Sequence, residues 1–179
     1  MKRDFHYIAD LLEGFFKQRK IGKALRIIEE CEITGWEVWF QIEFSYYLSQ
    51  HESFPEWWRE RPVEFDRRRE KEKNFCRPDF IIRKKGWRQD AYAALEVKQH
   101  PEAAVCFSNM MRDIEKIAKI KSSSLDVRSF WVLGIHRKKS KSELRDMVMN
   151  RFEAAGLDYF EESTLIRYIP NSNYAYTMF

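Results

Sequence analysis

The sequence predicts an α/β fold, in which helices cover the faces of a mixed β-sheet. Apolar residues recur at helical spacing over much of 5–49. Short apolar runs typical of strands occupy 80–82, 91–99 and 130–135. Helical patterns follow the second and the third of these runs. Helices before, between and after strands indicate a mixed sheet with helices on its faces.

Two helices are expected at the start of the chain. Asp4 can cap the first of them. Its broad apolar face carries Phe5, Ile8, Leu11, Leu12, Phe15 and Phe16. A shorter second helix is expected around 24–31, and Thr34-Gly35 ends it.

A third helix is expected over 36–49, and its two sides differ. An aromatic stripe runs along one side, formed by Trp36, Trp39, Phe40, Phe44 and Tyr47. Glu43 falls within this stripe, whereas Glu37, Gln41 and Ser45 occupy the opposite, polar side. We therefore expect Glu43 to face inward among aromatic side chains.

The middle of the chain predicts three strands. The alternation over 63–67 is typical of a half-exposed strand, and 80–82 and 91–99 form the next two. Lys84-Lys85-Gly86 predicts a hairpin turn between the latter pair, and His100-Pro101 ends the third strand. A helix over 102–121 then leads to the run 130–135, which we expect to be buried on both faces. Such a crossover connection makes the strands on either side of it parallel.

The end of the chain predicts one more helix and a short strand. The helix spans 140–155, begins with a capping pair of Ser140 and Glu143, and ends at Gly156. The strand covers 164–169. We expect a single domain over 1–179, with an N-terminal helical extension over 1–35, a core over 36–136 and a C-terminal helix and strand over 137–179.

Composition narrows the class of protein. Hydrophobic residues make up 44% of the 179 residues and aromatic residues 16%, enough for a sizeable core. The net charge is only +4, so contacts to a nucleic acid must come from local patches. Cys31, Cys76 and Cys106 are widely spaced and form no Cys-x-x-Cys motif, which favours a reducing compartment. The N-terminus lacks an apolar signal core and no run suits a membrane span. We expect a cytoplasmic protein with no membrane partner.

Two short motifs carry the candidate chemistry. Pro78-Asp79 opens one expected strand, and Glu96-Val97-Lys98 lies within the next. Period-two geometry puts Glu96 and Lys98 on one face of their strand, and a hairpin can bring Asp79 beside Glu96. Two carboxylates this close repel unless a cation lies between them, and Mg²⁺ prefers oxygen ligands. The Val97 carbonyl could be a further ligand. The alternative is a turn residue and a surface ion pair.

Glu43 adds weight to the first interpretation. A carboxylate among aromatic side chains is costly unless it is paired or bound to a metal. Its partner could be the same metal or Lys98. The alternatives are an arginine in the core or a position at the edge of the stripe, where Glu43 reaches solvent.

Together these residues resemble the PD-(D/E)XK nuclease superfamily, which has a restriction-endonuclease-like fold. The resemblance rests on Glu43 in an aromatic-rich helix, Pro78-Asp79, Glu96-Val97-Lys98 and the segment 113–117. That family has a core of helix, three strands, helix and strand, which is similar to 36–136 here. The resemblance implies that Asp79 and Glu96 ligate a metal and that Glu43 adds a ligand or positions a metal-bound water. It also implies that Lys98 orients the attacking water or stabilises charge on phosphorus.

The implied activity is a Mg²⁺-dependent endonuclease, with Mn²⁺ as a possible substitute and DNA as the expected substrate. The candidate residues for contacts to the nucleic-acid backbone are Arg67, Arg69, Lys84, Lys85, Arg137 and Lys138. Each of them could instead lie in a solvated loop. Cutting both strands would need a homodimer or a partner protein. The terminal aromatic residues, Tyr168, Tyr174, Tyr176 and Phe179, suit either such a surface or a tail folded back onto the core. The alternatives are an inactive nuclease-like module that binds nucleic acid or protein, and a nuclease for RNA or branched DNA.

Overall fold

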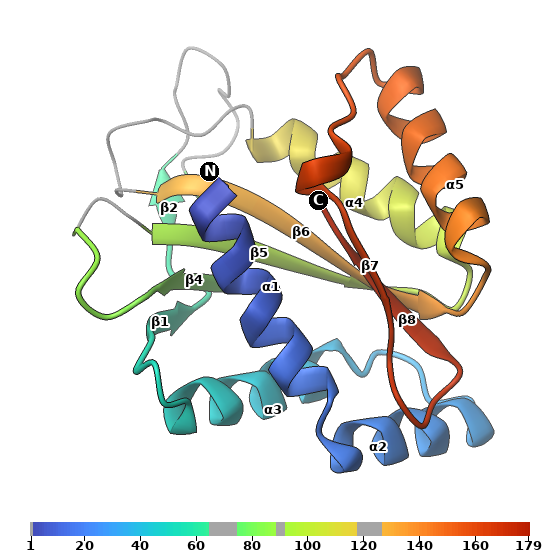
Figure 1. Ribbon diagram of the computed structural model, residues 1–179, viewed down its shortest axis with the longest axis horizontal. Helices are drawn as coiled ribbons and strands as arrows, with labels where there is room; N and C mark the ends of the chain where they lie inside the picture. The colour runs from blue at the N-terminus through green and yellow to red at the C-terminus, as the bar shows by residue number, and fades with distance from the viewer. Residues whose placement is uncertain (1, 65–74, 89–91, 118–126) are drawn as a thin grey trace.

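The computed structural model describes residues 2–64, 75–88, 92–117 and 127–179 (Figure 1). Within these ranges the chain forms five α-helices, a six-stranded mixed sheet and a two-stranded sheet. The α/β class expected from the sequence is therefore confirmed. The expected helix over 102–121 is present up to Ile117, and its last residues lie outside the described ranges.

The main sheet has the strand order β1-β4-β5-β6-β8-β7. Its strands are β1 (Glu56–Arg59), β4 (Phe80–Arg83), β5 (Tyr92–Gln99), β6 (Val127–Arg137), β7 (Leu165–Tyr168) and β8 (Tyr174–Met178). β5 and β6 are parallel, as the crossover predicts, and the other neighbouring pairs are antiparallel. The short strands β2 (Val63–Glu64) and β3 (Phe75–Cys76) form the second sheet.

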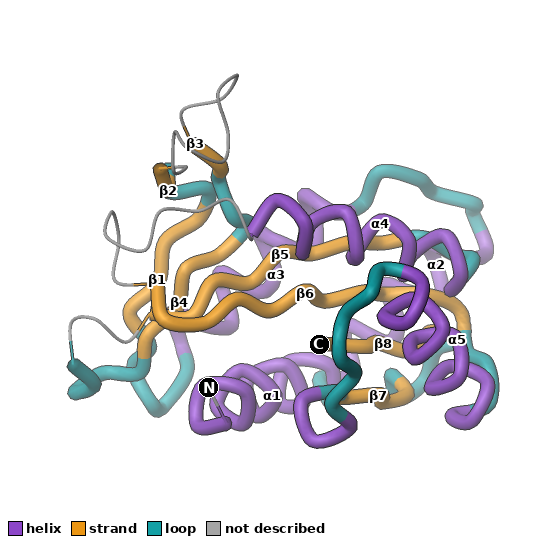
Figure 2. Tube along the Cα trace, turned by 90° about the horizontal axis from the view of Figure 1, so that it is seen from above, coloured by secondary structure: helices purple, strands orange, loops and turns teal. Residues whose placement is uncertain are grey.

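Helices cover both faces of the main sheet (Figure 2). On one face lie α1 (Lys2–Phe16), α2 (Arg19–Glu30) and α3 (Glu37–Gln50), and on the other lie α4 (Ala103–Ile117) and α5 (Lys141–Ala154). Val97 of β5 belongs to the first core, with the aromatic residues of α1 and α3. Because side chains alternate along a strand, Glu96 and Lys98 face the second layer, on the side of α4.

Three strands, β1, β3 and β8, were not expected from the sequence. β1 contains Trp57 and Trp58, in a segment that two prolines mark as a connection. β8 contains the aromatic residues Tyr174 and Tyr176, and it is buried along its whole length between β6 and β7. The terminal residues therefore form an inner strand of the sheet, which corresponds to the folded-back alternative. Of the expected strand over 63–67, only Val63–Glu64 lies in the described ranges.

The predicted capping pair at the start of α5 is confirmed. The Glu143 amide donates to Ser140 Oγ at 3.2 Å, and the Ser140 amide donates to Glu143 Oε2 at 3.0 Å. Gly156 follows the C-cap with a φ of +65°, a left-handed conformation that glycine adopts without a steric penalty. None of the helices in the described ranges has the length and apolar character needed to cross a bilayer.

Candidate active site

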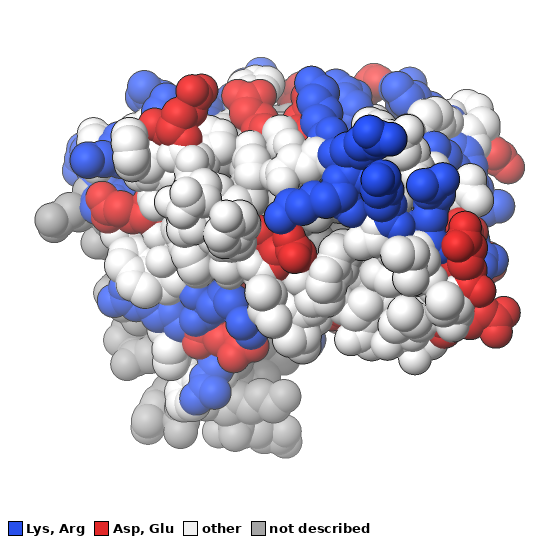
Figure 3. All heavy atoms as spheres, turned by 90° about the horizontal axis from the view of Figure 1, so that it is seen from below, with Lys and Arg blue, Asp and Glu red and all other residues white. Residues whose placement is uncertain are grey.

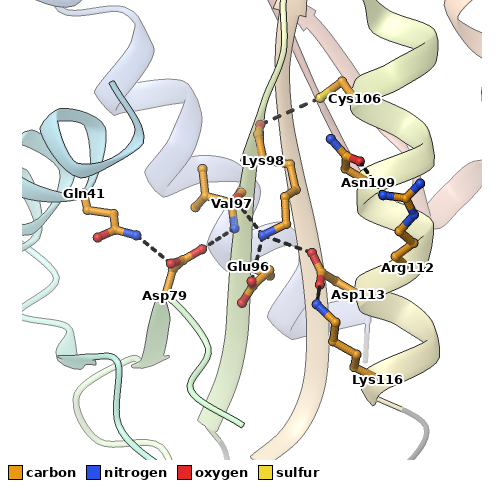
Figure 4. Close-up of polar contacts among 10 residues, drawn as sticks. All are labelled: Gln41, Asp79, Glu96, Val97, Lys98, Cys106, Asn109, Arg112, Asp113 and Lys116. Atoms are coloured by element: carbon orange, nitrogen blue, oxygen red, sulfur yellow. Dashed lines mark hydrogen bonds and ion pairs between the residues drawn. The ribbon is translucent and has the colours of Figure 1, made fainter. Parts of the chain in front are cut away.

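The β4–β5 hairpin brings Asp79 and Glu96 together. Phe80 pairs with Leu95 in this antiparallel ladder. Asp79, which precedes β4, therefore lies beside the Glu96-Val97 segment of β5, and its carboxylate accepts from the Val97 amide. This is the geometry that the two motifs predict, and Figure 4 shows the cluster around them.

Asp79 is held by neutral hydrogen-bond donors. Gln41 Nε2 donates to Asp79 Oδ1 at 2.5 Å, and the Val97 amide donates to Asp79 Oδ2 at 2.7 Å (Figure 4). The residue is only 8% exposed. Burial, together with the charge of Glu96, raises the pKa of Asp79 to about 7 even though the Val97 amide opposes the shift. A carboxyl group in this state is close to uptake or release of a proton at neutral pH.

Lys98 is the cation of the cluster. Its ammonium nitrogen lies 2.8 Å from Glu96 Oε1, 3.0 Å from Asp113 Oδ2 and 3.1 Å from the Val97 carbonyl oxygen. Burial lowers the pKa of Lys98, but the adjacent carboxylates of Glu96 and Asp113 outweigh it and raise the pKa overall. Lys98 therefore carries a positive charge at physiological pH, in a fixed position between two acids.

Asp113 is a member of the cluster whose role the sequence did not indicate. It projects from α4, its side chain is only 5% exposed, and Lys116 of the next helical turn forms an ion pair with it. The segment 113–117 was part of the family resemblance, but neither residue was assigned a function. The available signal was an acid on the crossover helix, close behind the strand that carries Lys98.

The side of α3 that faces the cluster is the polar one. Gln41 is buried and contacts Asp79, and Glu37, one turn earlier, is half-buried. Burial raises the pKa of Glu37, with Glu96 and Asp113 adding to the shift and Lys98 opposing it. Glu37 is therefore within electrostatic reach of the whole cluster. Helical spacing placed Glu37 and Gln41 on one side, but it did not show that this side meets the sheet.

The expectation that Glu43 converges on Asp79 is corrected by the structure. Glu43 lies two residues after Gln41, which at 100° per residue is the other side of α3. Its carboxylate pairs with Lys20 of α2 at 2.7 Å, and its side chain is 29% exposed. This is the alternative of a position at the edge of the aromatic stripe, stabilised by a surface ion pair.

The residues predicted to contact a nucleic-acid backbone do not gather at the cluster. Arg67 and Arg69 lie outside the described residues. Lys84 and Lys85 follow the end of β4 that is farthest from Asp79. At the end of β6, Arg137 pairs with Glu29, and the next residue, Lys138, donates to the Ser172 carbonyl.

A basic surface that the sequence analysis missed lies on α2. This basic face consists of the exposed side chains Arg19, Lys20, Lys23 and Arg26. Figure 3 shows the Lys and Arg side chains gathered over α2. They are spread through an amphipathic helix whose opposite side buries Ile21, Leu25 and Ile28. Because they form no consecutive run, only the helical period reveals them.

The oxygen donors near Asp79 are of the type that a hard divalent cation prefers. They are not arranged around one point as the ligands of a bound metal ion would be. Asp79 and Glu96 offer carboxylate oxygens, and Gln41 Oε1 is buried with no hydrogen-bond partner among the described residues. Within the described ranges, no group of three or more His, Cys, Asp or Glu side chains is placed to hold a metal ion. Lys98 binds Glu96 and draws Asp113 toward itself. A metal ion would therefore share the Glu96 carboxylate with Lys98, whose ammonium contacts Oε1.

A scan of protein-family models and searches of curated proteins and of solved structures find no match to this chain. The assignment of a function consequently rests on the chemistry of the cluster.

Proposed function

We propose that this chain is a metal-dependent endonuclease of the PD-(D/E)XK type, with a restriction-endonuclease-like core formed by α3, β4, β5, α4 and β6. The observation that carries the proposal is the position of Asp79 beside the Glu96-Val97 segment of β5, with Lys98 two residues after Glu96 on the same strand face. Two carboxylates and an ammonium at one point suit hydrolysis of a phosphodiester, because such a reaction needs a bound cation and a fixed positive charge.

Asp79 and Glu96 are the residues that would hold Mg²⁺ or Mn²⁺, with Gln41 Oε1 as the nearest orphaned oxygen donor. Such an ion supplies a coordinated water of lowered pKa and neutralises negative charge on the phosphate. Glu37 takes the place that the sequence analysis gave to Glu43, because its charge reaches Glu96, Lys98 and Asp113.

The other residues of the cluster orient these groups. The Val97 amide and Gln41 fix both oxygens of Asp79. Asp113 holds Lys98 at the cluster when Glu96 turns to another partner, so the ammonium remains where negative charge develops. Lys116 forms a second ion pair with Asp113 and so helps to hold that side chain in place. The basic face of α2 offers a second contact for the nucleic-acid backbone.

Nicking of supercoiled plasmid DNA in the presence of Mg²⁺ or Mn²⁺ tests the proposal. Asp79→Asn and Lys98→Met should each lower the rate by at least about a hundredfold, because each removes a charge used in the transition state. Glu43→Gln is the matched control, since it removes an acid from α3 that does not face the cluster. Equal nicking by the wild type and by Asp79→Asn would show that the activity does not belong to this site.

The same proteins distinguish DNA cleavage from the alternatives. RNA and branched DNA are used as parallel substrates, and cleavage confined to one of them would redirect the proposal to that substrate. Isothermal calorimetry with Mn²⁺ gives an independent result, because a binding module without catalytic function should take up no metal through Asp79. Uptake by the wild type that is lost in Asp79→Asn is the expected outcome.

A further inference from the structure

A second concave site lies at the far edge of the main sheet from Asp79. It is a cavity of about 210 Å³ between the first turns of α5, the segment 159–164 and the edge strand β7. Three strands, β6, β8 and β7, follow β5 in the sheet order, so this cavity and the Asp79 cluster are separate. Its volume is below the roughly 300–1,000 Å³ typical of sites for drug-sized ligands, which indicates a small ligand or a single group.

The charged lining of this cavity is unbalanced. Lys141, Arg145 and Arg167 line it, against the single carboxylate of Glu161. Arg145 pairs with Glu161 at 3.0 Å. In the described part of the chain, no acidic side chain forms an ion pair with Lys141 or Arg167. Glu13 lies close enough for the charge of Arg167 to affect it, but its carboxylate pairs with Lys17 at 2.6 Å.

A neighbouring contact brings another cation to the same corner. The ammonium groups of Lys138 and Lys141 lie 5.5 Å and 5.6 Å from the centre of the Tyr168 ring. The hydroxyl of this ring donates to the Lys139 carbonyl at 2.9 Å, which fixes the ring in place. Like charges held together around one fixed ring raise the local positive potential and favour an anion.

The geometry points to this cavity as a binding site for a phosphate group. The three cations and one carboxylate that line it leave a net charge of +2, which matches the charge of about −1.5 to −2 that a phosphomonoester carries at pH 7. Arg145 and Arg167 offer planar donor forks that suit phosphate oxygens, and Lys141 adds a point charge. Tyr159 and Thr164 also line the cavity. The phosphate belongs either to a free small molecule or to the 5′ end of a nucleic acid.

Calorimetric titration of the full chain with inorganic phosphate, at low ionic strength and pH 7.5, tests the site. Lys141→Gln and Arg167→Gln should each weaken binding about tenfold, the loss expected when one charge-assisted contact is removed. Lys2→Gln, which removes the same charge from the exposed first turn of α1, should change the dissociation constant less than about twofold. Absence of binding by the wild type, or an equal loss in Lys2→Gln, would overturn the proposal.

Two further titrations identify the source of the phosphate. A 5′-phosphorylated dinucleotide that binds more tightly than inorganic phosphate, and loses that affinity in Lys141→Gln, indicates a nucleic-acid end. Equal or weaker binding than inorganic phosphate indicates a free ligand, and both results keep the site. Asp79→Asn should leave phosphate binding unchanged, so failure of the nuclease proposal and failure of this one are distinguishable.

Discussion

Two buried aspartates of this chain, Asp4 and Asp79, have opposite surroundings. Asp4 of α1 is fully buried, and it accepts from both Nε and a terminal nitrogen of Arg128 and from Ser129 Oγ. Asp79 is also buried, but its partners are two neutral amide groups, and the side chain across the hairpin is the acid Glu96. The first carboxylate is matched by a cation of the protein, and the second by none at hydrogen-bonding distance among the described residues.

The difference separates a structural acid from a candidate functional one. A buried charge that meets a guanidinium is satisfied by the fold itself. A buried acid that faces another acid raises the free energy of the folded state, and the raised pKa of Asp79 reports this. Such an arrangement is explained if a ligand of opposite charge completes it, which is the role proposed for a divalent cation.

Of the changes predicted here, removal of the Asp4 charge should have the largest effect, which is a loss of folding stability. Asp4→Asn removes a fully buried carboxylate that accepts from Arg128 and Ser129 at the junction of α1 and β6, so we expect a loss of about 3 kcal/mol in the free energy of unfolding. Urea denaturation at pH 7 measures it. A loss below about 1 kcal/mol would mean that Asp4 is no more tightly integrated than a surface acid, and the contrast with Asp79 would disappear.

The second largest effect is expected in the rate of nicking as the pH is varied. Only ionised Asp79 can ligate a cation, and its pKa of about 7 leaves most molecules protonated at pH 5. With Mg²⁺ below saturation, the rate should therefore rise almost tenfold between pH 5 and pH 6 and gain roughly fiftyfold between pH 5 and pH 7, before it levels off. The initial rate of plasmid nicking in constant-ionic-strength buffers gives the profile. A rate independent of pH over this range would contradict the proposed role of Asp79.

Substitution of Asp79 should change the stability less than substitution of Asp4, and in the opposite direction. The folded-state pKa of Asp79 is raised, so the stability it contributes is present below about pH 4 and is lost as the pH rises through 7. Asparagine has no charge, can accept from the Val97 amide and can donate to the orphaned Gln41 Oε1. Without metal, Asp79→Asn should be more stable than the wild type by on the order of 1–2 kcal/mol at pH 8.

The control for this prediction is the same comparison at pH 4.5, where the two proteins should unfold at similar urea concentrations. A variant that is less stable than the wild type at pH 8 would show that Asp79 is a structural acid like Asp4.

The elements of the fold that depend on local sequence pattern could be predicted from the sequence. The apolar run 130–135 and the capping pair of Ser140 and Glu143 predict β6 and α5 directly. β8 could not be predicted in this way, because Tyr174–Met178 is buried only by the strands on either side of it. Its burial depends on pairing with β6, which is distant in the sequence.

The residues of the candidate site also divide into those that local sequence pattern predicts and those that it does not. Asp79, Glu96 and Lys98 were found because a hairpin and a two-residue strand period fix their relation. Gln41 and Asp113 reach the cluster from helices, and helical periodicity shows which residues share a side without showing what that side meets. Glu43 does not reach the cluster for this reason, since the aromatic stripe of α3 packs in the core and the polar side of the helix contacts Asp79.

Glu37 and Glu43 therefore provide the most sensitive comparison, because they are acids of one helix on different sides of it. Glu37→Gln should lower the rate of nicking about fivefold, since its charge acts on the cluster without contacting Asp79. Glu43→Gln should change the rate less than twofold, and stability by less than about 0.5 kcal/mol, because it loses only an exposed ion pair with Lys20. Rates measured at one Mg²⁺ concentration with both variants decide the matter. A greater loss in Glu43→Gln than in Glu37→Gln would assign the third acid to the aromatic side of α3, and the polar side would then be structural.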